Sequence, residues 1–249
     1  MAFPTTISGS YGWEKVQTSD QRHKLGTEMQ FVDGRKYRYV EVGGSAITEG
    51  LLVASEAPAG NHDEDLAVAT TAAGSTTVAV TLGATAAAKD LYAEGYLFIN
   101  VPILGTSANP HEMYKIKSHA QTDANGALTA TLDEPDGLVT AVTNGTETVG
   151  LIKSPYKDIV VAPAAVAGRF VGITTMSMTA NYFGWVQVAG IATAAIDGTP
   201  AVGTLVGASS NHAGQLLAVG ADTTPAIARM HGKAGVDNEY HTVMLMNLY

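Results

Sequence analysis

The segment closest to a known catalytic signature is His111-Glu112-Met113-Tyr114-Lys115. Zinc proteases place two histidines one helical turn apart so that both bind the metal, and the glutamate between them acts as general base. Lys115 stands where the second histidine is required, so one of the two metal ligands is missing. The sequence therefore predicts a loop leading into a strand here, and no zinc site.

Two polar loops carry oxygen ligands that could bind a hard cation. Asn61-His62-Asp63-Glu64-Asp65 offers them in a row, but consecutive residues cannot easily all face one ion. A solvated acidic loop is favoured there, and a Ca²⁺ or Mg²⁺ site stays open as the alternative. Asp123-Ala124-Asn125-Gly126 resembles part of a calcium loop but lacks the later bidentate glutamate, so it predicts a hairpin turn.

Other reaction chemistry finds no support in the sequence. There is no Gly-x-Ser-x-Gly nucleophile motif and no phosphate-binding glycine loop. The acidic cluster Asp133–Asp136 flanks a proline in a turn, where no carboxyl would be shielded enough to serve as a general acid. Cysteine is absent, which excludes disulfides, thiolate metal sites and cysteine nucleophiles. The sequence predicts no catalytic residue, no cofactor and no metal site, and hence a protein that is not an enzyme.

The composition points to β-structure and to association. Charged residues make up 15% of the chain, against about 25% in an ordinary soluble domain. A surface with so few charges is poorly protected against association, which favours an oligomer or a protein bound to a partner over a lone monomer. The net charge of −9 makes nucleic acid an unsuitable partner. We also expect no membrane association, because the longest apolar runs are far shorter than a membrane span.

Short runs of alternating or β-branched residues, separated by glycine turns, predict an all-β fold of the sandwich or barrel class. Ala84–Asp90 is the only segment that suggests a helical turn, and Asp197-Gly198 is expected to turn a hairpin into Val202–Val206. The expected strands lie within Met29–Val40 (two strands around an Asp33-Gly34 turn), Leu51–Ala54, Thr76–Leu82, Tyr96–Val101, Met113–Lys117, Ala127–Leu132, Ile159–Ala162, Phe170–Thr175, Tyr182–Val188, Val202–Val206 and Tyr240–Tyr249.

The same patterns divide the chain. Residues 1–28 show no sustained period of apolar residues, neither of two nor of 3.6, and are predicted to form an extended N-terminal arm. The polar loop Ser55–Asp65 is the best boundary, so residues 29–60 and 154–249 are assigned to a main β domain. Residues 61–153 form an inserted or second β domain.

The arm is the predicted partner-binding segment. Tyr11 and Trp13 are the candidate anchors, since aromatic side chains supply much of the energy of such contacts. Arg22 and Lys24 contribute to the net charge of +2 that residues 1–38 carry from six basic and four acidic residues. We expect these residues to add binding energy and not core stability; a merely solvated terminus is the alternative.

Several segments, taken in order, resemble those of the capsid cement or decoration proteins of tailed bacteriophages. The resemblance implies a protein on the outside of the capsid, often a homotrimer, that binds the major capsid protein and has no catalytic residues. It also implies synthesis in the host cytoplasm and a final place on the virion. The resembling segments are Leu25–Thr27, Asp33–Val40, Gly43–Leu52, Tyr92–Ile99, Tyr114–His119 and Tyr182–Val188.

Two other classes stay open. One is another virion part, either a phage tail or baseplate component or a sugar-binding adhesin. Exposed aromatic platforms would favour the adhesin, and Tyr37, Tyr39 and Trp185 are the side chains that would form them. The other is a β-fold hydrolase, for which the sequence shows no set of catalytic residues.

Overall fold

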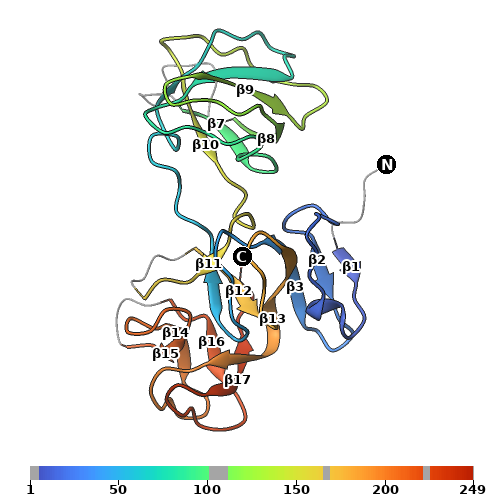
Figure 1. The fold of residues 1–249 in the computed structure, drawn as a ribbon, viewed down its shortest axis with the longest axis vertical. Helices are drawn as coiled ribbons and strands as arrows, with labels where there is room; N and C mark the ends of the chain where they lie inside the picture. Colours follow the sequence, from blue (N-terminus) through green and yellow to red (C-terminus); the bar gives the residue numbers. More distant parts are fainter. Residues whose placement is uncertain (1–5, 101–111, 165–168, 221–224, 249) are drawn as a thin grey trace. The chain divides into compact units, whose positions relative to one another are not determined.

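In the computed structural model, which describes residues 6–100, 112–164, 169–220 and 225–248, the protein is almost entirely β-structure. The predicted all-β fold is confirmed. The chain divides into two units, of which unit 1 comprises Met1–Glu56 and Pro155–Tyr249 and unit 2 comprises Ala57–Ser154 (Figure 1). These limits lie within a few residues of the boundaries expected at 60/61 and 153/154.

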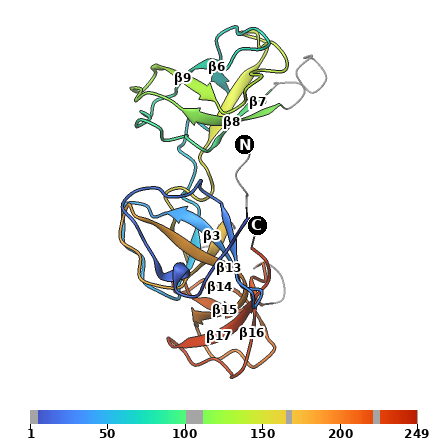
Figure 2. The same ribbon diagram turned by 90° about the vertical axis from the view of Figure 1, so that its right-hand side faces the viewer.

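Unit 2 is a six-stranded antiparallel sheet that curves until it nearly closes (Figure 2). Its spatial order is β5-β10-β7-β8-β9-β6, and Val68, just after β5, bridges to Val80 in β6. One face of each strand points inward, so alternate residues such as Leu128 and Ala130 are fully buried. The strands are β5 (Leu66–Ala67), β6 (Thr77–Thr81), β7 (Tyr96–Asn100), β8 (Met113–Ser118), β9 (Ala127–Leu132) and β10 (Thr148–Ile152).

Unit 1 holds the larger sheet, with the path β1-β2-β3-β13-β17-β16-β14-β15 and with β12, β4 and β11 branching from β13. Its strands are β1 (Thr6–Ser8), β2 (Glu28–Gln30), β3 (Lys36–Glu41), β4 (Leu52–Ala54), β11 (Val160–Val161), β12 (Phe170–Thr174), β13 (Phe183–Ala195), β14 (Leu205–Ala208), β15 (Leu216–Ala218), β16 (Ala228–Met230) and β17 (Tyr240–Leu245).

Strand β13 connects two curved halves of this sheet. Its first part pairs with β3 and β12, and its second part pairs with β17. Between them the register against β3 shifts at Gln187/Ala189, and Gly190 takes a φ of 86°. This left-handed conformation favours glycine, and an added Cβ would also meet the backbone of Arg35 at 3.1 Å. Glycine thus permits the bend that turns β13 from one half into the other.

The described part of the N-terminal segment is packed against unit 1, in contrast to the expected free arm. β1 pairs in parallel with β2, and Thr18 bridges to Phe183 in β13. A 3-10 turn, η1 (Trp13–Lys15), buries Glu14, and Leu25 joins the core formed with Tyr39 and other residues. The segment thus runs through a short strand, a 3-10 turn and further turns, and its pairings with β2 and β13 join it to the main sheet.

Two local predictions were wrong. Ala84–Asp90 forms no helical turn; Ala87 bridges to Thr122 instead. The Asp197-Gly198 turn does not join a hairpin, because β14 pairs with β15 and β16 and not with β13. In both places a non-local pairing prevails over the local preference.

Candidate functional site

The predicted anchors Tyr11 and Trp13 are solvent-exposed, with exposed fractions of 65% and 50%. The Tyr11 ring is not free to move, because it packs edge-on against Phe31 with 5.3 Å between centroids. The Arg35 guanidinium lies over the same ring at 5.5 Å. An aromatic side chain held in this way loses little conformational entropy when it binds a partner.

Two valines extend this apolar surface. Val16 follows η1 and is 52% exposed, and Val32 is 94% exposed in the turn beside Phe31. We call Tyr11, Trp13, Val16 and Val32 the N-terminal surface. The sequence prediction identified its two aromatic members but neither valine.

Arg22 and Lys24 lie on a different part of the segment, on either side of His23, whose ring packs edge-on against Tyr39. The Arg22 amide donates to the Tyr39 hydroxyl at 3.0 Å, and the Lys24 carbonyl accepts from Thr27 at 3.1 Å. Both side chains are exposed, and the Arg22 guanidinium lies 3.9 Å from Asp20. An exposed pair of this kind contributes little to stability, so the Arg22 charge can still attract a partner at long range.

The aromatics that would have formed a sugar-binding platform are core residues. Tyr37, Tyr39 and Trp185 are at most 5% exposed and pack together beneath the N-terminal segment. Tyr39 and Trp185 meet with 5.0 Å between their ring centroids. A ring buried in this way cannot stack on a ligand, so the adhesin hypothesis loses the residues on which it was based.

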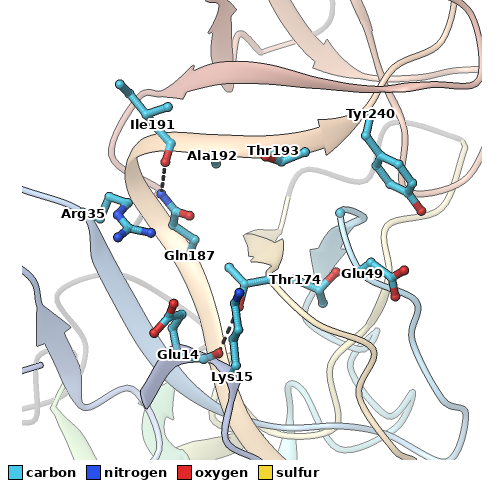
Figure 3. A pocket seen from close by; sticks show the side chains of 12 residues that line it. Glu14, Lys15, Arg35, Glu49, Thr174, Gln187, Ile191, Ala192, Thr193 and Tyr240 are labelled. Carbon is cyan, nitrogen blue, oxygen red and sulfur yellow. Dashed lines mark hydrogen bonds between the residues drawn. The ribbon is translucent and has the colours of Figure 1, made fainter. Parts of the chain in front are cut away.

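Unit 1 contains a solvent-open cavity of about 440 Å³, which the sequence analysis did not anticipate (Figure 3). Glu14, Arg35 and Gln187 form one wall, and Glu49 and Tyr240 form the opposite one. The lining comes from η1, β12, β13, β17 and the loops before β3 and β4, so no local motif could reveal it. The only signals in the sequence are a glutamine within the apolar run of β13 and a glutamate beside Trp13.

The arrangement nearest to a catalytic triad is Asp197, Ser209 and His212. A serine nucleophile needs histidine between itself and the carboxylate. Here the Ser209 hydroxyl donates directly to Asp197, and His212 approaches the other carboxylate oxygen at 3.4 Å. The Ser209 oxygen also accepts from the amides of Asn211 and His212, at 2.9 and 3.0 Å. This is a turn-stabilising network, with no base positioned to activate the serine.

The network makes a testable contribution to stability. Burial raises the pKa of Asp197, but the hydrogen bonds from Ser209 and Asn211 and the proximity of His212 outweigh it, so the pKa lies below its ordinary 3.8. We expect Asp197→Asn to lower the free energy of unfolding at pH 7 by about 1–3 kcal/mol. The difference from the wild type should be complete above about pH 4 and disappear as the pH falls through the folded-state pKa, because wild-type Asp197 then takes up a proton.

Urea unfolding of both proteins at pH 7 and pH 3 measures this difference. The control is Asp20→Asn. The Asp20 side chain is 77% exposed, so this substitution should change the free energy of unfolding little at either pH. An Asp197→Asn penalty of equal size at both pH values would contradict the electrostatic explanation.

In unit 2, the potential cation-binding loop is held by structural contacts. His62 is fully buried; its Nε2 donates to the Thr85 carbonyl at 2.7 Å, so its Nδ1 accepts from the Tyr92 hydroxyl at 2.5 Å. Asp65 accepts from Asn100 and Thr148, each at 3.2 Å. With both ring nitrogens engaged, His62 has no lone pair left for a metal.

The failed zinc motif is also structural where it is described. Glu112 accepts from the hydroxyls of Tyr114 and Thr140. Burial raises the pKa of Tyr114 to about 12, and the bond to Glu112 adds to the effect. His111 lies outside the described residues. Within the described ranges, no three His, Cys, Asp or Glu side chains are grouped so that they could hold a metal ion.

Comparison with known proteins gives no relative from which a role could be transferred. No family model, curated protein or solved structure matches the chain. Among the described residues, no helix is long and apolar enough to span a membrane.

Proposed function

We propose that this chain is a structural protein of a tailed-phage particle, which binds the outside of the capsid and stabilises contacts between major capsid subunits. The single observation that carries the proposal is the N-terminal surface, whose aromatic and apolar side chains are exposed and of which Tyr11 is packed against Phe31. Protein interfaces concentrate their binding energy in such aromatic anchors. The resemblance of the strand segments to capsid decoration proteins supports the choice of the major capsid protein as the proposed partner.

The low charge of the whole chain supports association as its role. A cement protein is present in many copies, so weak contacts at each copy combine over the lattice. In this proposal the protein forms a homotrimer on its shell, and Arg22 and Lys24 speed its approach to an acidic coat surface.

The test is co-sedimentation of the purified protein with tailed-phage heads from which the native decoration protein has been removed. We expect the wild type to bind and the double variant Tyr11→Ala/Trp13→Ala to bind at least tenfold more weakly, because two aromatic anchors are lost. Both side chains are exposed, so the variant should keep its fold.

The matched control is Met113→Ala/Val139→Ala in unit 2, whose side chains are 61% and 77% exposed. Its affinity should equal that of the wild type. Two results would overturn the proposal: wild-type protein that does not sediment with the heads, or immuno-electron microscopy that locates the protein on the tail or baseplate.

A further inference from the structure

The cavity of unit 1 presents polar atoms that the protein itself leaves without partners. Glu14 is only 6% exposed; one carboxylate oxygen accepts from the Gly12 amide at 2.6 Å, and the other has no hydrogen bond among the described residues. Gln187 is 2% exposed, and its amide nitrogen donates to the carbonyls of Ala189 and Ile191. This fixes the side chain and leaves its oxygen facing the cavity (Figure 3).

The free oxygens of Glu14 and Gln187 open on the solvent of the cavity, so water or the donor groups of a ligand can satisfy them there. Both side chains are held in position. The bulge at Gln187/Ala189 holds Gln187, and η1 holds Glu14. Water can occupy such a site, and a ligand whose hydroxyl groups replace that water keeps the hydrogen bonds.

Donors lie around the same cavity. The Arg35 Nε donates to Asp33 at 2.8 Å, and its guanidinium also lies over the Tyr11 and Phe31 rings. Lys15, Thr193 and Tyr240, which line the cavity, supply an ammonium and two hydroxyl groups as further donors. Tyr240 also contributes a ring that is half exposed, with one part packed on Gly50. The cavity therefore combines fixed acceptors, donors and an apolar ring surface.

The charged groups of the lining do not select strongly for an ion of either sign. Glu14 and Glu49 face Lys15 and Arg35, and Arg35 is also paired with Asp33 outside the lining. Burial raises the pKa of Tyr37, next to this group, to about 12, and the charges of Glu14 and Asp33 add to the effect against the opposing Arg35, so this phenol adds no charge at neutral pH. The two glutamates attract a cation and the two basic side chains repel it, and for an anion the roles are exchanged.

We propose that this cavity binds a neutral saccharide of one or two rings. Each sugar hydroxyl both donates and accepts, which matches a lining that mixes acceptors and donors without net charge. The C–H face of the ring can pack on Tyr240, and the volume of about 440 Å³ lies within the ~300–1,000 Å³ of small-molecule sites. The proposal does not depend on the virion role, since the cavity and the N-terminal surface use different side chains.

The experiment is titration of the ¹⁵N-labelled full chain with maltose, lactose and N,N′-diacetylchitobiose, which differ in their ring substituents, followed by amide chemical shifts. We expect at least one sugar to give saturable shifts at Thr174, Thr175, Ala192 and Thr193. Tyr240→Ala should weaken binding at least tenfold, and the control Met113→Ala, an exposed side chain in unit 2, should leave it unchanged.

A second variant tests the buried acceptor. Glu14→Gln keeps the shape of the side chain but replaces one oxygen by a donor, so it should also weaken binding at least tenfold. Three results overturn the proposal: no saturable shifts with any of the three sugars, shifts confined to residues outside the cavity, or saturable binding of free glycine or lysine at the cavity in place of the sugars. Failure of this experiment leaves the capsid-binding test unaffected.

Discussion

A protein that begins at Met29 is expected to lose the fold of unit 1. The segment 6–28 contributes Leu25 to the core and covers Tyr39 and Trp185, whose rings pack against His23. At about 1.5–3 kcal/mol for each large side chain returned to water, the loss is on the order of 5 kcal/mol or more. This equals the whole stability of many domains. The measurement is hydrogen exchange of the truncated protein, in which amides of β3 and β13 should lose their protection.

The control is the full-length variant Tyr11→Ala/Trp13→Ala, which removes exposed side chains from the same segment and should keep the protection of β3 and β13. A truncated protein whose melting temperature stays within a few degrees of the wild type would show that residues 1–28 are a detachable arm. That outcome was the expectation from the sequence, and the buried contacts of Leu25 and Glu14 now argue against it.

The strands could be predicted because their burial alternates. In β9 the buried positions are Leu128, Ala130 and Leu132, and the predicted range Ala127–Leu132 is the observed one. The period of two is visible in the sequence because one face of the sheet meets the core and the other meets solvent. The same argument identified β6 and β8 within one residue at each end.

The role of the N-terminal segment could not be predicted, because aperiodic chain can be anchored by hydrogen bonds that leave no hydropathy pattern. The Gly26 amide donates to the Tyr39 carbonyl at 2.8 Å, and Thr18 and Phe183 exchange backbone bonds. Such pairings connect residues far apart in the chain, and only the folded structure shows them. The cavity was missed for the same reason, since Glu14, Gln187 and Tyr240 are distant in the sequence.

The importance of individual glycines is equally hard to predict from the sequence, because the sequence gives the position of a glycine but not the atoms that surround it. Gly95 precedes β7, and an added Cβ would lie 2.2 Å from the Ile152 carbonyl oxygen and 2.9 Å from the Ser154 nitrogen. Gly60, also in unit 2, has open space around the same position and no positive φ. Both residues stand in turn-like sequence, so only the structure distinguishes the essential glycine from the replaceable one.

Gly95→Ala is therefore expected to disrupt unit 2. The atoms in the way belong to the backbone at the end of β10, which pairs with β7 through Ile152 and Tyr96, so relief of the clash must break that pairing. We expect a loss of about 3 kcal/mol or more, in the range of severe overpacking.

The matched variant Gly60→Ala introduces the same methyl group where nothing lies within 4 Å, and it should change stability by less than about 1 kcal/mol. Hydrogen exchange of β7 and β10 compares the two directly: protection should fall in Gly95→Ala and persist in Gly60→Ala. Equal protection in both variants would mean that the end of β10 can move away from Gly95 without loss of pairing. The close approach of the two strands would then be incidental to the closure of the unit 2 sheet, and Gly95 would be as replaceable as Gly60.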